Sequence, residues 1–323
     1  MRAALITAGE RLELDCELPW VGELLAEGAA GELRSDPEGR ATVRIRVERE
    51  SAPFGVGARR LLARGVWAGD GEIVVENVCT RGFDLLARPT DAGAELVYRW
   101  RPPTRDRAAA LLLRSRFHLL ARAGYCMSTA LWWAGTRGRA PLHASACVAG
   151  SSVPLVTAQS GVGRSTLVLA QTASGGLATA DNLGVGDGTV VWGLVEPVRA
   201  TGGGGRRVSH GRQEQPLIGR VGAVEPDCVV VLERGGERTS LAPCSTEAAA
   251  RALVSSTYMA GELRRYWGFA ATLATGTGVG PPHPPVTDVA ETFAARLPRF
   301  VLSLGVDRRC DLSELLEAAE VAA

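Results

Sequence analysis

The sequence contains no lysine, so all of its 36 basic residues are arginine. This absence excludes enzymes that form a Schiff base between a lysine amine and either pyridoxal phosphate or a carbonyl substrate. Asparagine is also scarce and occurs only at Asn77 and Asn182. The bias towards arginine, alanine, glycine and valine is typical of a protein from a very GC-rich genome.

An excess of charge of either sign is absent too, because 36 basic residues stand against 35 acidic ones and the formal net charge is +1. A chain without a strong overall field is not steered to nucleic acid or to an anionic membrane. We therefore expect neither as a partner, and we expect ligands to be recognised by local sites.

Disulfide, zinc and membrane patterns are also missing. The seven cysteines are scattered, odd in number and without a CxxC pair, which indicates reduced thiols. The four histidines lie far apart in sequence and do not predict a zinc site. No apolar run approaches the roughly 20 residues of a membrane-spanning helix. Residues 1–16 lack the apolar segment of a signal peptide. We expect a soluble, cytoplasmic protein.

Composition and periodicity predict three parts. Residues 1–103 form a small β-rich N-terminal domain, as the alternating stretch Ala41–Val47 indicates. Residues 104–136 carry leucine and alanine at helical spacing opposite arginines, which predicts connecting amphipathic helices with a solvated arginine face. Residues 137–323 form a domain in which strands and helices alternate. The expected fold class is α/β, or α+β overall, with a mixed sheet in the last domain.

The last domain begins with two short apolar runs, His143–Gly150 and Val153–Thr157, joined by a turn. A helix is predicted over Leu167–Ala173, and residues 201–215 form a glycine-rich polar loop. The remaining predicted elements are a buried strand over Asp227–Glu233, a mainly helical stretch over Thr246–Thr272, a helix over Asp288–Leu297, a strand over Phe300–Leu304 and a last helix from near Asp311.

Between the second apolar run and the first helix lies Ala158–Ser165, with the sequence AQSGVGRS. It follows the P-loop pattern G-x-x-x-x-G-K-[ST] with two departures. Ala158 replaces the first glycine, and Arg164 replaces the lysine that reaches the β- and γ-phosphates. Arginine keeps the charge but is bulkier and planar, so it is not interchangeable with lysine. An ordinary glycine-rich turn between strand and helix is the alternative.

The chemistry of such a loop is phosphate binding. Glycines let consecutive backbone N–H groups turn towards phosphate oxygens, and the positive end of the following helix adds to the attraction. The Ser165 hydroxyl would be a ligand for Mg²⁺ bound to the β- and γ-phosphates, and Arg164 would clamp the γ-phosphate. The predicted nucleotide-binding residues are Ser160, Gly161, Val162, Gly163, Arg164, Ser165 and Thr166.

Three segments, PLHASACV from Pro141, AQSGVGRSTL from Ala158 and LATADNLGV from Leu177, resemble the core of the HPr kinase/phosphorylase family. The fold of that family is related to phosphoenolpyruvate carboxykinase. In its members a strand with a histidine is followed by a P-loop, a helix and a strand that ends in Asp-Asp. The segment from Arg137 to about Leu232 resembles small HPr-kinase-like proteins encoded beside natural-product or peptide-modification genes. The resemblance implies an HPr-kinase-like P-loop domain that uses Mg²⁺ and ATP or another nucleoside triphosphate.

The resemblance also implies roles for single residues. His143 matches a histidine near the phosphates, with a core histidine as the alternative. Asp181 matches the first Asp of the pair, which would take the proton of the acceptor hydroxyl. Asn182 stands at the second Asp, a metal contact, and keeps an oxygen without its charge. Glu196 matches a metal-binding glutamate or is a surface charge. The implied catalytic residues are Asp181, Arg164 and His143, and the implied metal ligands are Ser165, Asn182 and Glu196.

Two further segments have alternative interpretations. Ser209–Arg212 offers an arginine for transition-state charge and a histidine for proton relay, or it is a solvated loop. Val229–Glu233 superficially resembles a Walker B strand, and we interpret it as a plain core strand. The glycine-rich signature that HPr kinases carry after their metal-binding glutamate is not recognisable, which argues against HPr as the substrate.

Three functions are open on this basis. The first is a Mg-ATP-dependent kinase acting on a hydroxyl of a peptide, protein or small molecule. The second is a pseudo-kinase that binds nucleotide or peptide as a scaffold, which Arg164 and Asn182 favour. The third is an interaction protein whose β-rich part docks a peptide by strand addition. HPr kinases assemble into rings, so the resemblance also implies a homo-oligomer.

Overall fold

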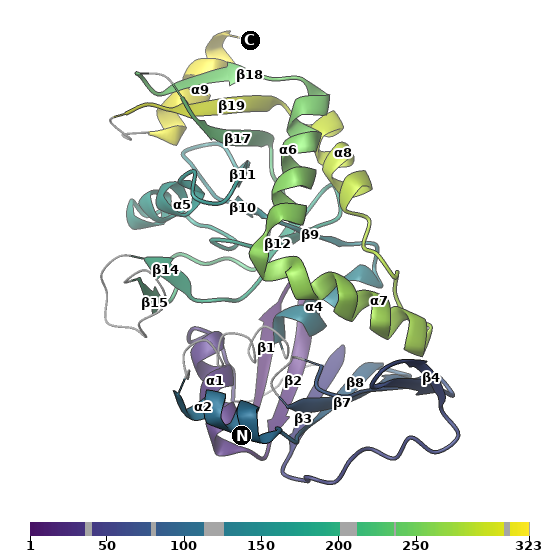
Figure 1. Ribbon diagram of the computed structural model, residues 1–323. Helices are drawn as coiled ribbons and strands as arrows, with labels where there is room; N and C mark the ends of the chain where they lie inside the picture. The colour runs from purple at the N-terminus through teal and green to yellow at the C-terminus, as the bar shows by residue number, and fades with distance from the viewer. Residues whose placement is uncertain are drawn as a thin grey trace. The chain divides into compact units, whose positions relative to one another are not determined.

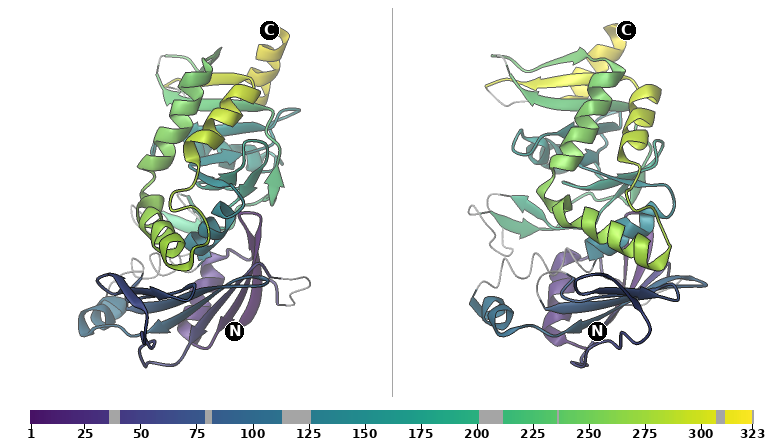
Figure 2. Two further views of the ribbon diagram at one scale, coloured as in Figure 1. Left: turned by 90° about the vertical axis from the view of Figure 1, so that its right-hand side faces the viewer. Right: turned by 45° about the vertical axis from the view of Figure 1, so that its right-hand side comes forward.

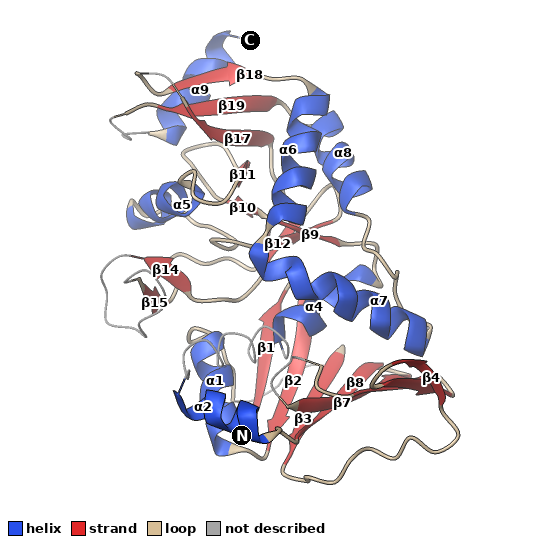
Figure 3. Ribbon diagram, viewed as in Figure 1, coloured by secondary structure: helices blue, strands red, loops and turns tan. Residues whose placement is uncertain are grey.

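The computed structural model describes residues 1–35, 41–78, 82–112, 126–200, 212–235, 237–306 and 311–322. The chain forms two compact units, each built around a mixed sheet (Figures 1 and 3), which confirms the predicted α/β class. Unit 1 comprises Met1–Arg137, Val195–Pro216 and Arg265–His283, and unit 2 comprises Gly138–Leu194, Leu217–Arg264 and Pro284–Ala323. The predicted parts are contiguous in sequence, whereas these compact units are not.

Unit 1 contains an eight-stranded sheet with the order β1-β2-β3-β8-β7-β6-β5-β4. Its strands are β1 (Arg2–Thr7), β2 (Glu10–Cys16), β3 (Val43–Glu48), β4 (Arg60–Ala63), β5 (Val66–Gly69), β6 (Glu72–Val75), β7 (Phe83–Thr90) and β8 (Gly93–Trp100). Strand β3 runs parallel to β2 and β8, and the other neighbours pair antiparallel. A separate pair of strands, β14 (Val198–Ala200) and β15 (Gln213–Gln215), belongs to the same unit.

The core of unit 1 lies between one face of the large sheet and its helices. In β3, Val43, Ile45 and Val47 are buried at alternate positions, which is the pattern of a strand with one core face. The helices that pack there are α1 (Pro19–Gly28) on β2, α4 (Ser128–Gly135) on β2, and α7 (Tyr266–Thr277) on β5, β6 and β7. Helix α2 (Thr104–Leu112) begins the predicted 104–136 segment, of which residues 113–125 lie outside the described residues.

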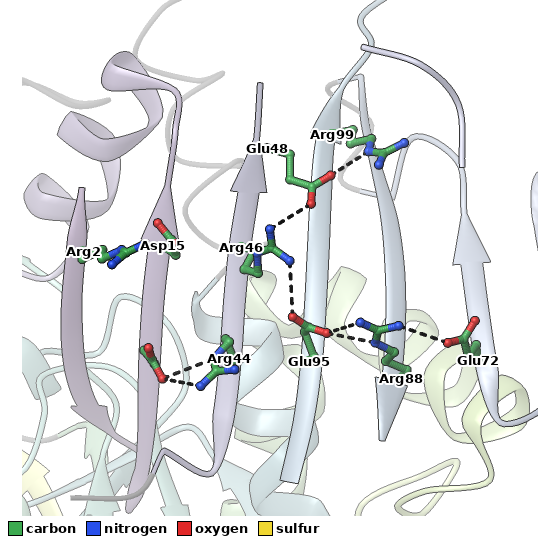
Figure 4. A network of polar contacts seen from close by, with 10 residues as sticks. Arg2, Asp15, Arg44, Arg46, Glu48, Glu72, Arg88, Glu95 and Arg99 are labelled. Carbon is green, nitrogen blue, oxygen red and sulfur yellow. Dashed lines mark hydrogen bonds and ion pairs between the residues drawn. The ribbon is translucent and has the colours of Figure 1, made fainter. Parts of the chain in front are cut away.

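The other face of this sheet carries a row of ion pairs (Figure 4). Arg88 binds Glu95 at 2.6 Å, and Glu95 is also 3.7 Å from Arg46. Arg46 lies 3.3 Å from Glu48, which accepts a hydrogen bond from Arg99 at 2.9 Å. Partly exposed pairs of this kind contribute about 0–1 kcal/mol each. The same face also holds a small apolar cluster around Phe54, Val74 and Val97, so the pairs make only part of this face polar.

Unit 2 contains a five-stranded sheet with the order β10-β11-β17-β19-β18 and a four-stranded sheet with the order β16-β13-β12-β9. The strands of the larger sheet are β10 (Ala144–Ala146), β11 (Pro154–Ala158), β17 (Cys228–Arg234), β18 (Ser240–Pro243) and β19 (Arg299–Leu304). Those of the smaller sheet are β9 (Ala140–Leu142), β12 (Gly184–Gly186), β13 (Val191–Gly193) and β16 (Ala223–Val224). Because β11, β17 and β19 are parallel, their carboxyl ends share one edge, where α/β proteins bind ligands.

The helices and short turns of unit 2 are α5 (Arg164–Ala173), α6 (Thr246–Met259), η3 (Gly261–Arg265), α8 (Val286–Arg296) and α9 (Leu312–Ala322). Helix α6 packs on β11, β17 and β19 and lies beside α8 (Figure 2). Asp311 Oδ1 accepts hydrogen bonds from the N–H groups of Ser313 and Glu314, so the predicted start of the last helix is confirmed. Within the described part of the chain, every helix is too short or too polar to cross a membrane.

Most predicted elements of unit 2 are confirmed. The two apolar runs form the antiparallel pair β10 and β11, and the predicted buried strand is β17. The helix after the P-loop begins at Arg164, three residues earlier than predicted, because the helix already includes the polar end of the loop motif. The stretch Thr246–Thr272 is helical but is interrupted at Ala260, between α6 and η3.

We expect Gly276→Ala to destabilise unit 1. A Cβ at Gly276 in α7 would lie 2.3 Å from Ile73 Cδ1 and 2.7 Å from Ile73 Cβ on β6. Overpacking of this kind costs about 1–3 kcal/mol, more than the roughly 1 kcal/mol by which alanine exceeds glycine in helix propensity. The measurement is the free energy of unfolding in urea.

Gly268→Ala in the same helix is the matched control. A Cβ there would meet nothing within 4 Å, so the substitution should stabilise the protein slightly. Equal effects of both substitutions would contradict the close packing of α7 on β6.

Candidate functional site

The predicted P-loop lies in unit 2 between β11 and α5 (Figure 1). Ala158 is the last residue of β11, and Arg164 is the first residue of α5. Gly161 and Gly163 have φ angles of 84° and 132°, which residues with a Cβ adopt at a cost. The strand, the glycine turn and the helix that a phosphate loop requires are therefore present in this order.

The N-terminus of α5 is suited to an anion. Gly163 is its N-cap and has no side chain that could accept a hydrogen bond from the first turn. The first N–H groups of a helix have no partner within the helix, and the helix dipole is positive at this end. Ser160 and Thr166 are exposed, and Ser165 is half-buried, so a ligand can reach the loop. Phosphate binding by Ser160–Thr166 stays a prediction.

Arg164 differs from its neighbours because its side chain points into the protein and is 6% exposed. Its Nη1 donates to the carbonyl oxygen of His143. Its Nη2 donates to both the backbone oxygen and Oδ1 of Asn182, at 2.9 and 3.0 Å. The guanidinium thereby links the first turn of α5 to the start of β10 and to the segment before β12. The γ-phosphate contact predicted for Arg164 stays a prediction.

His143 is buried beside this guanidinium, and its Nε2 lies 3.1 Å from Asn182 Oδ1. An amide oxygen accepts but does not donate, so Nε2 carries the proton and donates. The pKa of His143 is lowered to about 4, first because the ring is buried and second because Arg164 is positive. The negative charge of Glu262 opposes this shift. The ring is therefore neutral at pH 7 and holds Asn182 in place.

Asp181 is the buried carboxylate of the site, with 8% exposure. The segment that carries it runs alongside β10, because the N–H of Thr179 donates to the carbonyl of Ala146 at 2.9 Å. Asp181 therefore lies two residues after this backbone hydrogen bond. It directly precedes Asn182, which accepts a hydrogen bond from Arg164. The structure brings His143, Arg164 and Asn182 into contact, with Asp181 next in sequence. A role for Asp181 as base stays a prediction.

Oxygen donors suitable for Mg²⁺ are present in unit 2. Mg²⁺ in nucleotide sites takes one or two protein oxygens together with phosphate oxygens and water, so the Ser165 hydroxyl and the Asp181 carboxylate fit it chemically. Asn182 Oδ1 already accepts two hydrogen bonds. Glu196 belongs to unit 1, and its role as a ligand stays a prediction. Across the described ranges, no three His, Cys, Asp or Glu side chains gather at one point.

Arg234 contacts the loop, a role that the sequence did not suggest. This last residue of β17 donates from Nη2 to Gly161 O at 2.7 Å and from Nε to Val162 O at 3.1 Å. Cys228, Val229, Val230 and Leu232 of β17 are buried, as expected of a core strand. An arginine after a buried strand was the available signal, but only the sheet order shows that β17 adjoins the P-loop strand β11.

The segment Ser209–Arg212 lies outside the described residues except for Arg212, so its alternative interpretations remain predictions.

No family model matches the chain, and no curated protein matches it in sequence. A comparison with solved structures finds the HPr(Ser) kinase/phosphatase from Coxiella burnetii. The match covers 56% of this chain and 91% of that one, at 12% sequence identity and a TM-score of 0.30. A similarity of that size supports no assignment of function, which rests on the geometry of the P-loop and its neighbours.

We expect Arg164→Lys to lower the free energy of unfolding by about 1–3 kcal/mol. A single ammonium cannot span the carbonyl of His143 and both oxygens of Asn182, so a buried acceptor loses its partner. Chemical denaturation measures the effect. Arg251→Lys on the exposed side of α6 is the control and should change stability by less than about 0.5 kcal/mol. Equal stability of the two variants would show that the Arg164 contacts are not used in solution.

We expect the stability of the protein to fall as the pH decreases from about 6.5 to about 4, partly because of His143. The ring has a pKa of about 4 in the folded protein against an ordinary value of 6.5, so the unfolded chain binds the proton first. Stability due to the neutral ring is complete above pH 6.5 and is lost below pH 4, with an upper value of about 3 kcal/mol.

The measurement is the free energy of unfolding against pH for the wild type and for His143→Gln. The variant should show a shallower decline in this window. Parallel curves would mean that His143 titrates normally in the folded state.

Proposed function

We propose that the protein binds a nucleoside triphosphate at residues 160–166 and acts as a Mg²⁺-dependent kinase on a hydroxyl of a peptide, protein or small-molecule acceptor. One observation carries this proposal: strand β11 is followed by two glycines with positive φ and then by the N-terminus of α5, which has no side-chain cap. The proposal is also supported by the buried polar residues Arg164, His143 and Asp181 near the same end of α5, because such residues are rare in protein cores.

In this proposal the residues have separate tasks. The loop N–H groups and the N-terminus of α5 hold the phosphates. The Ser165 hydroxyl would hold Mg²⁺ together with phosphate oxygens and water, and Mg²⁺ supplies neutralisation of phosphate charge when bound. Asp181 accepts the proton of the acceptor hydroxyl, and neutral His143 keeps Asn182 oriented. Arg234 fixes two loop carbonyls, so the loop is held in one conformation.

A pseudo-kinase is the second candidate, and the orientation of Arg164 favours it. A P-loop cation that is 6% exposed and hydrogen-bonded to Asn182 and His143 stabilises the fold and leaves the γ-phosphate without its usual partner. Asn182 also lacks the charge of an aspartate. Such a protein binds the nucleotide as a scaffold and transfers nothing. The two candidates differ in whether the γ-phosphate is transferred.

Docking of a peptide by strand addition is compatible with either candidate. Strand β4 is the last strand of the sheet order in unit 1, and Leu61 in its middle is 59% exposed. An edge strand of this kind presents backbone donors and acceptors to an added strand. Self-assembly of the chain, its cytoplasmic location and a hydroxyl-bearing acceptor remain predictions.

We expect calorimetry to show binding of Mg-ATP by the wild type. Ser165→Ala should weaken the Mg²⁺-dependent affinity about tenfold, because it removes one metal oxygen. Ser174→Ala at the far end of α5 is the control and should bind as the wild type does. Absence of binding at millimolar Mg-ATP would exclude both candidates.

Turnover separates the kinase from the scaffold. Asp181→Asn should keep nucleotide binding and lower the rate of phosphate transfer or ATP hydrolysis by about 10²–10⁴-fold. A wild type that binds Mg-ATP without any turnover, and that stays inactive as Arg164→Lys, is a scaffold.

A further inference from the structure

A pocket of about 380 Å³ lies in unit 2 beside the P-loop. One wall is the loop and the first turns of α5, with Thr166, Leu167 and Ala170. The opposite wall is formed by the ends of β17 and β19 and the residues that follow them, with Arg234, Leu304 and Val306. We propose that this pocket binds the base of the nucleoside triphosphate whose phosphates lie at the P-loop. The proposal rests on the proposed function and extends it to a second part of the ligand.

The position of the pocket supports this occupant. Val162 and Gly163 line the pocket and also belong to the predicted phosphate loop, so one ligand can extend from the loop into the pocket without a break. The carboxyl ends of β17 and β19 form its far side, and this edge of a parallel sheet is where α/β proteins bind ligands. The volume lies within the range of small-molecule sites, about 300–1,000 Å³.

The chemistry of the walls selects a flat, uncharged ring next to a polyanion. Leu167, Ala170 and Leu304 supply apolar surface, and Arg234 is the charged residue of the lining. Two hydrogen bonds to the P-loop carbonyls fix the plane of the Arg234 guanidinium. A fixed guanidinium stacks on aromatic faces, and every nucleic-acid base has such a face.

Two glycines lie in the wall of the pocket formed by the ends of β17 and β19. A Cβ at Gly235 would meet nothing within 4 Å, so this position borders open space. A Cβ at Gly305 would lie 2.6 Å from the backbone carbon of Arg238 and from the nitrogen of Thr239. The chain after β19 therefore passes directly against the segment before β18, and only glycine permits this wall.

The test compares binding of Mg-ATP and of Mg-tripolyphosphate by calorimetry in the wild type and two pocket variants. Ala170→Trp fills the pocket from α5, and Val306→Trp fills it from the opposite wall. Both positions are exposed, Val306 by 81%, so a large side chain does not have to enter the core. Ala173→Trp, on the same helix, exposed and outside the lining, is the matched control.

We expect the wild type and Ala173→Trp to bind Mg-ATP about tenfold more tightly than Mg-tripolyphosphate, because only ATP places a base in the pocket. In both pocket variants the affinity for Mg-ATP should fall to that for Mg-tripolyphosphate, which should stay unchanged.

Three results would overturn the proposal. Equal affinity of the wild type for the two ligands, or an ATP advantage that survives in both pocket variants, would remove the base site and leave the phosphate site intact. The second of these results, combined with loss of transfer to an acceptor, would assign the pocket to the acceptor. Failure of the wild type to bind either ligand would remove the proposed function together with the pocket.

Discussion

The site depends on a buried arginine. A guanidinium inside a protein is tolerated only when its donors are satisfied, because its charge cannot be removed by deprotonation. The two terminal nitrogens of Arg164 meet this condition with acceptors from two other segments, the carbonyl of His143 and the two oxygens of Asn182. The start of α5, the start of β10 and the segment before β12 must therefore be in register before the arginine can be buried.

This constraint explains the chemistry of its neighbours. A permanent positive charge next to His143 reinforces the effect of burial, and the imidazole stays neutral. Neutral imidazole can donate through Nε2, and Asn182 accepts from the ring and from the guanidinium at one oxygen. In a chain without lysine, arginine at the P-loop position brings its own requirement for several fixed acceptors. The same requirement draws its side chain away from the exposed end of α5.

The phosphate loop and its pocket depend on sheet order. Strands β11, β17 and β19 are neighbours and parallel, although long segments of chain separate them. Their carboxyl ends place the P-loop, Arg234 and Leu304 at one edge. Arg234 donates hydrogen bonds to two carbonyl oxygens of the loop, and its guanidinium also lines the pocket. In unit 1, ion pairs of alternating sign line part of one face of the broad sheet, and apolar residues of the other face, such as Val43, Ile45 and Val47, are buried (Figure 4).

The sequence by itself determined the local structure: the glycine turn between β11 and α5, the hairpin of β10 and β11, the core strand β17 and the cap of α9 at Asp311. These features depend on residues close together in the chain, so the conformational preferences and the periodicity of a short stretch of sequence predict them. The resemblance also named His143, Arg164 and Asn182, three residues that the fold brings into contact. Tertiary structure alone decided that Arg164 points inward, that Arg234 binds the loop and that two late segments belong to unit 1. Each of these follows from strand order and from competition among distant acceptors for one buried charge, which local sequence does not encode.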